Sequence, residues 1–145
     1  MRTLTIDPAQ VDLREVIDRG VLLHGHLGPF LVAGIRMGHL ALTLLDSPGY
    51  FGIRVESQAG STTPLSCLND GIQIGSGCTA GKGNLVVIDG GTPRAIFASE
   101  RGMVEIELRQ DVVASFRGCD IIERSRELET MPLEDLFQWT RSPSA

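Results

Sequence analysis

The sequence predicts an α+β fold in a single domain that spans residues 1–145. Segments with helical periodicity occupy both ends of the chain, whereas segments that alternate apolar and polar residues are concentrated between positions 51 and 109. Three of the alternating segments follow one another across short turns, which favours a largely antiparallel sheet. A chain of 145 residues, 42% of them apolar, is long enough to bury a core without disulfides.

Two helices are predicted at the start of the chain. The first begins at Pro8, because an Asp-Pro pair is typical of a helix start, and it continues to about His24. The second covers Phe30–Leu45 and is apolar over most of its circumference, as expected of a buried helix. Gly34 and Gly38 share one face of this helix and would let another backbone come close.

A strand and a third helix are predicted next. Apolar residues alternate with Gly, Arg and Glu from Phe51 to Glu56, which indicates a strand with one buried face. Thr63 and Pro64 repeat the signal of a helix start, and glycines at 75 and 77 end the helix. Cys67 would then lie in the first turn and a half, a position that lowers the pKa of a thiol.

The second half of the chain is predicted to contain three strands and three short helices. The strands are Leu85–Asp89, Arg94–Ser99 and Met103–Arg109, with hairpin turns at 89–91 and 100–102. The helices are Val112–Arg117, Asp120–Glu129 and a last one that begins at Met131-Pro132 and includes Phe137 and Trp139.

Composition excludes several classes of protein. The net charge of −5 and the pI near 5.1 argue against a nucleic-acid partner, which requires clustered cations. The apolar stretches fall short of the ~20 residues that a membrane span requires, so no membrane association is expected. The first 20 residues carry four carboxylates and lack an apolar signal region, so the cytoplasm is the expected location. The three cysteines are expected to be thiols or metal ligands.

Two histidines and two cysteines form a candidate metal site. The candidate ligands are His24, His26, Cys67 and Cys78. Gly25 permits the backbone turn that both histidines need to reach one ion, and Cys78 lies in a Gly-rich run from 75 to 83 whose N–H groups can converge. Zinc prefers these ligand types, and iron or nickel would also suit them.

Other interpretations stay open at this point. Each cysteine could be a small buried apolar residue, and the histidines could be hydrogen-bonded residues at a helix junction. A metal-free enzyme could use Cys67 or Cys78 as the nucleophile and a histidine as the base. A non-catalytic subunit of a redox complex could dock through the apolar helix or through residues 133–139. Four polar residues are candidates for binding a small anionic ligand: Asp70, Gln73, Thr79 and Lys82.

Four motifs together resemble the FmdE family of formylmethanofuran dehydrogenase. In chain order they are His24–Pro29, Gly34–Gly38, Cys67–Gln73 and Gly77–Leu85. The resemblance implies an α-β-α-β-β-β core, a divalent metal near the His and Cys positions, and a homodimer. One position departs from the family pattern: Gly28 stands where the family usually carries a Cys, which leaves the number of ligands open. The expected function is that of a small metal-binding protein of this type.

Overall fold

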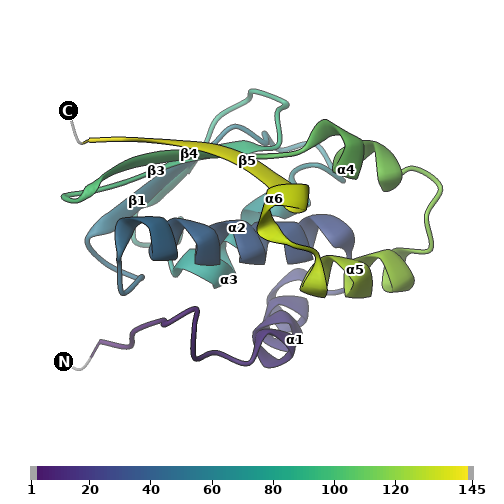
Figure 1. The fold of residues 1–145 in the computed structure, drawn as a ribbon, viewed down its shortest axis with the longest axis horizontal. Helices are drawn as coiled ribbons and strands as arrows, with labels where there is room; N and C mark the ends of the chain where they lie inside the picture. Colours follow the sequence, from purple (N-terminus) through teal and green to yellow (C-terminus); the bar gives the residue numbers. More distant parts are fainter. Residues whose placement is uncertain (1–2, 144–145) are drawn as a thin grey trace.

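The computed structural model describes residues 3–143 and has the predicted α+β class. Its elements follow in the order α1 (Leu13–His24), α2 (Pro29–Leu45), β1 (Ile53–Ser57), α3 (Cys67–Ser76), β2 (Leu85–Val87), β3 (Arg94–Ser99), β4 (Gly102–Leu108), α4 (Gln110–Ser115), α5 (Ile121–Thr130), α6 (Leu133–Leu136) and β5 (Phe137–Ser142). Figure 1 shows the sheet as one layer, α2 and α3 beneath it, and α1 on the side of these helices away from the strands.

The strands form one sheet in the order β2-β1-β3-β4-β5. Only the β1–β2 pair among these is parallel, and the other three pairs are antiparallel, so the predicted largely antiparallel sheet is confirmed. The turn at 100–102 joins a hairpin, with Ser99 opposite Gly102. The hairpin predicted at 89–91 is wrong, because β1 lies between β2 and β3. Helix α3 connects β1 to β2 as a crossover, and such a connection makes two neighbouring strands parallel.

Helices α1 and α3 begin later than predicted. The N-cap of α1 is Asp12, which accepts the backbone N–H of Glu15, whereas Asp7 closes a separate turn around Pro8. Helix α3 begins at Cys67 instead of Pro64, because the segment before Cys67 forms turns.

The last predicted helix ends early. Only Leu133–Leu136 is helical, and the chain then forms β5 along the edge of β4. Phe137 and Trp139 alternate with polar residues and lie opposite Leu108 and Ile106. The period-2 pattern and the open edge of β4 therefore outweigh the helical spacing of the apolar residues.

The packing of α2 against α3 requires glycine on both helices. A Cβ atom on Gly34 would lie 2.3 Å from the carbonyl oxygen of Leu68, and one on Gly71 would lie 2.2 Å from the carbonyl oxygen of Leu31. A Cβ atom on Gly38 would lie 2.7 Å from the backbone of Gly75. The close approach predicted for Gly34 and Gly38 is therefore confirmed. We call this contact the glycine seam (Gly34, Gly38, Gly71 and Gly75); it holds α3 in one position relative to α2.

The core lies between the sheet and these two helices. Its largest fully buried side chains include Leu31, Ile35 and Met37 of α2, Phe97 of β3 and Ile106 of β4. No helix within residues 3–143 has the length and apolar character that a bilayer crossing requires.

Candidate functional site

The last residue of α1 and the first turn of α3 meet in a histidine–carboxylate pair. His24 Nδ1 lies 2.6 Å from Asp70 Oδ2, and the His24 side chain is 10% exposed. The tautomer that carries hydrogen on Nδ1 donates it to Asp70 and leaves a lone pair on Nε2. His24 Nε2 is buried and has no hydrogen-bond partner in the described part of the chain. A buried acceptor without a partner is costly, so this atom marks a place where an outside group would be stabilised.

The second histidine lies beside the first. Gly25 caps the end of α1: its left-handed φ of 98° turns the chain, and its N–H donates to the carbonyl oxygen of Val21. This turn brings the rings of His24 and His26 to 4.5 Å between centroids. Gly28 has extended backbone, and a Cβ atom there would lie 3.4 Å from His26 Nε2. A side chain at position 28 would therefore contact His26.

Cys67 is the first residue of α3 and lies one turn before Asp70 on the same face of the helix. Burial raises the pKa of its thiol, and the charge of Asp70 raises it further. This direction is opposite to the one predicted from the helix position. The thiol packs against the core and faces a carboxylate, and these two effects outweigh the helix dipole.

Cys78 is not brought to the histidines. Its side chain is fully buried in the core, and its Sγ lies 3.7 Å from the carbonyl oxygen of Ile53 on β1. Burial raises the pKa of this thiol as well. Within residues 3–143, no three His, Cys, Asp or Glu side chains are grouped closely enough to hold a metal ion. Of the four predicted ligands, His24 therefore contacts Asp70 and lies beside His26, Cys67 lies one turn before Asp70 on α3, and Cys78 is inside the core.

The residues considered for an anionic ligand also divide into two places. Asp70 belongs to the histidine pair, whereas Gln73, Thr79 and Lys82 line a separate cavity of about 570 Å³. Lys82 Nζ donates to the carbonyl oxygen of Gly77 at 2.7 Å and to Oγ1 of Thr79 at 3.0 Å. The end of the Gly-rich run is therefore a folded loop in which Lys82 is hydrogen-bonded to residues of the same loop.

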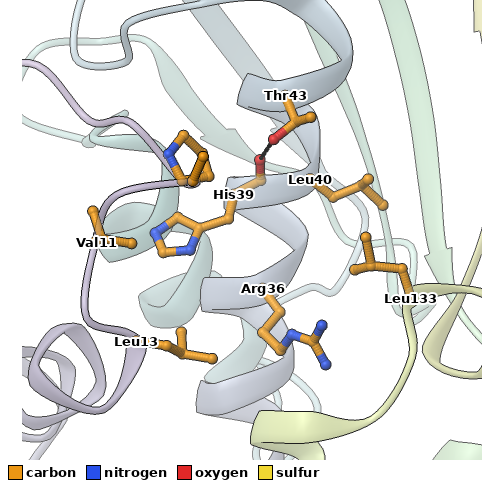
Figure 2. A pocket seen from close by; sticks show the side chains of 9 residues that line it. Val11, Leu13, Arg36, His39, Leu40, Thr43 and Leu133 are labelled. Atoms are coloured by element: carbon orange, nitrogen blue, oxygen red, sulfur yellow. Dashed lines mark hydrogen bonds between the residues drawn. The ribbon is translucent and has the colours of Figure 1, made fainter.

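Two polar residues of α2 have roles that the sequence does not reveal. Arg36 Nη1 donates to the carbonyl oxygens of Leu128 and Met131 at the end of α5. His39 is largely buried, its Nε2 has no hydrogen-bond partner among the described residues, and burial together with Arg36 lowers its pKa to about 4. Figure 2 shows the ring of His39 directed towards Val11, and Arg36 directed towards the Leu133 side. In the sequence, the signal that could have pointed to these residues is an Arg and a His three positions apart in an otherwise apolar helix.

Comparisons with known proteins agree with this fold. A solved structure described as a tungsten formylmethanofuran dehydrogenase FmdE-like protein from Syntrophus aciditrophicus superposes with a TM-score of 0.65. The match covers 99% of this chain and 78% of that one at 17% identity, so it shows a common fold.

Sequence comparisons point to the same family. A protein of Archaeoglobus fulgidus described as a probable S-adenosyl-L-methionine-binding protein is 30% identical over 87 residues, or 55% of this chain. The aligned part is only 22% of that protein's length. The sequence model of the FmdE family, described as "Molybdenum formylmethanofuran dehydrogenase operon", matches residues 23–138. Because this match covers most of the chain, including all four of the motifs, the chain belongs to the FmdE family.

Proposed function

We propose that this FmdE-type protein binds a divalent metal ion, zinc by preference, with His24 Nε2 as the central ligand and His26 and Cys67 as further ligands. The observation that carries the proposal is the buried Nε2 of His24, which has no partner in the described chain while Nδ1 is held by Asp70. Histidines that bind metals nearly always donate their other ring N–H to a carboxylate, a carbonyl or water.

The neighbouring residues are chemically suited to this role. His26 supplies a second imidazole next to His24, and Cys67 supplies a thiol on the face of α3 that carries Asp70. Asp70 orients His24 and raises the basicity of its free nitrogen. Binding displaces the Cys67 proton, so affinity increases with pH. When bound, a zinc ion with an open coordination position supplies Lewis-acid chemistry.

The side chains need to move to complete this site, since no three of them are grouped closely enough in residues 3–143. His26 is exposed and follows a glycine turn, so its ring has room to move. His24, in contrast, is held by Asp70. We therefore assign His24 and Asp70 as the rigid part of the site and His26 as the adjustable part.

Cobalt titration of metal-free protein tests the proposal. We expect one Co²⁺ per chain and a thiolate charge-transfer band, which Cys67→Ser abolishes and His24→Ala weakens together with the affinity. Asp70→Asn should lower the affinity by about 10- to 100-fold, as for other residues that orient a ligand. Cys78→Ala is the matched control and should keep both the band and the affinity. A band that persists in Cys67→Ser, or unchanged affinity in His24→Ala, would contradict the proposal.

Position 28 offers a test in the opposite direction. Gly28→Cys places a thiol next to His26, because the added Cβ would lie 3.4 Å from Nε2, and the extended backbone accepts any residue. We expect this change to tighten zinc binding by about tenfold or more in competition with a chromophoric chelator. Gly28→Ala adds the same Cβ without sulfur and should not tighten it. Equal affinity in the two variants would remove position 28 from the site.

The structure gives less support to the cysteine-nucleophile alternative. Burial raises the pKa of both Cys67 and Cys78, whereas a nucleophilic cysteine needs a lowered pKa.

The homodimer stays a prediction, which native mass spectrometry checks.

A further inference from the structure

A cavity of about 570 Å³ lies between α1, the carboxyl end of α3 and the N-terminal segment. This volume falls in the usual range for small-molecule sites. Its walls are mostly aliphatic, with Leu4 and Ile6 on the N-terminal segment, Leu23 on α1 and Ile74 on α3. Its charged lining consists of two cations, Arg19 and Lys82, and no acidic residue in the described chain lines it. None of the proposed metal ligands lines it either.

Lys82 has an unneutralised charge at this cavity. It is the sole lysine of the sequence. Both of its recorded hydrogen-bond acceptors, the carbonyl of Gly77 and the hydroxyl of Thr79, are neutral oxygens. No carboxylate within residues 3–143 lies within 4.0 Å of its Nζ. An ammonium group has three donor hydrogens, so one remains for a ligand.

The wall beside Lys82 is rigid. Tyr50 has a left-handed φ of 67°, which is strained for a residue with a side chain. It is held there because its N–H donates to Ser76 and its carbonyl accepts from Asn84. Its ring packs so closely on Gly77 that a Cβ there would lie 2.6 Å from it. Backbone strain of this kind persists only where the surroundings enforce it, and it is concentrated at functional sites.

His39 contributes its imidazole ring to the lining of the cavity. Its buried Nε2, which has no hydrogen-bond partner among the described residues, belongs to a side chain that lines the same cavity. Figure 2 shows its ring beside Val11 in another pocket, which shares these two residues with the cavity. The lining thus combines aliphatic walls, two cations, an aromatic ring and an imidazole ring, in a chain whose net charge of −5 otherwise repels anions.

We propose that this cavity binds a small organic anion, a carboxylate or a phosphate ester with an apolar body. The anionic group pairs with Lys82 and Arg19, and the apolar body lies against the aliphatic wall formed by Leu4, Ile6 and Ile74. The site is separate from the proposed metal site and does not require a metal.

Calorimetry with defined probes, in the presence of EDTA, tests the proposal. The probes are octanoate and 1-naphthyl phosphate, which distinguish the two anion types, with octanol and inorganic phosphate as controls for the apolar and anionic parts alone. We expect at least one of the two organic anions to bind with one molecule per chain. Both controls should bind at least about tenfold more weakly, because octanol lacks the charge-assisted hydrogen bond and inorganic phosphate lacks the apolar contact.

Lys82→Met should lower the affinity for the organic anion by about tenfold or more. Arg54→Met is the control, because Arg54 is an exposed cation on β1 that does not line the cavity, and it should leave the affinity unchanged. The sole lysine allows a second readout: a saturating organic anion should slow acetylation of Lys82 but not of the terminal amine, as followed by mass spectrometry. The proposal is overturned if neither organic anion binds, if octanol binds as tightly as octanoate, or if Lys82→Met binds normally. Since EDTA is present, these outcomes leave the metal proposal unaffected.

Discussion

Helix α2 is packed by α3 on one side and by α5 on another, and the two contacts are built differently. The glycine seam brings α2 and α3 into backbone contact, with no room for a Cβ atom at Gly34 or Gly71. Helix α5 is instead held by side chains: Leu128 is fully buried in the core, and the guanidinium of Arg36 donates to the carbonyls of Leu128 and Met131 at the end of that helix. Helix α3, which carries Cys67 and Asp70, is thus positioned by backbone contacts, whereas α5 is held by side chains.

The largest effect should follow a change in the glycine seam. In Gly71→Ala the new Cβ would lie 2.2 Å from the carbonyl oxygen of Leu31, so the two helices must separate. We expect a loss of about 3 kcal/mol or more in the free energy of unfolding, measured in urea. The same change should weaken cobalt binding, because Asp70 moves away from His24.

Gly81→Ala is the matched control for this prediction. Nothing lies within 4 Å of a Cβ at Gly81, so its stability should stay within about 0.5 kcal/mol of the parent. Equal stability of the two variants would show that the seam tolerates side chains.

His39, on the face of α2 away from the glycine seam, should make the stability of the protein depend on pH. Its pKa falls from 6.5 in the unfolded chain to about 4 in the folded one, because of burial and the charge of Arg36. Below pH 6.5 the unfolded state binds a proton that the folded state does not, so stability is lost as pH falls from 6.5 towards 4. The loss should total about 3 kcal/mol, and His39→Met should remove it. Parallel stability curves for the two proteins over this range would contradict the assignment.

A smaller effect is expected when α5 loses its attachment. Arg36→Met keeps a long apolar side chain and leaves the carbonyls of Leu128 and Met131 without this donor, at a cost of about 2 kcal/mol. Hydrogen exchange should become faster at the end of α5 but not in α3. Faster exchange in both helices would mean that the two contacts are not independent.

The candidate site was only partly predictable from the sequence. Ligand type and motif order predict His24, His26, Cys67 and Cys78 as ligands, and Gly25 does make the turn that brings the histidine rings together. The partnership of Asp70 with His24 could not be predicted, because 46 residues separate them and the approach of α1 to α3 sets their distance. The burial of Cys78 agrees with the alternative that it is a small buried apolar residue, but a Gly-rich motif does not show which way its thiol points, so the sequence leaves both interpretations open.

The α+β class and most strands and helices could be predicted from the amino-acid order alone, because they depend on local periodicity, turns and caps. The same holds for the close approach of another backbone to α2, because Gly34 and Gly38 lie four residues apart on one face of the helix. Long-range packing, in contrast, makes Phe137–Ser142 a strand and sets β2 parallel to β1. It also brings Lys82, Tyr50 and His39 to one cavity. These outcomes depend on an open strand edge, a crossover helix and contacts between segments far apart in the chain, and local periodicity contains no information about them.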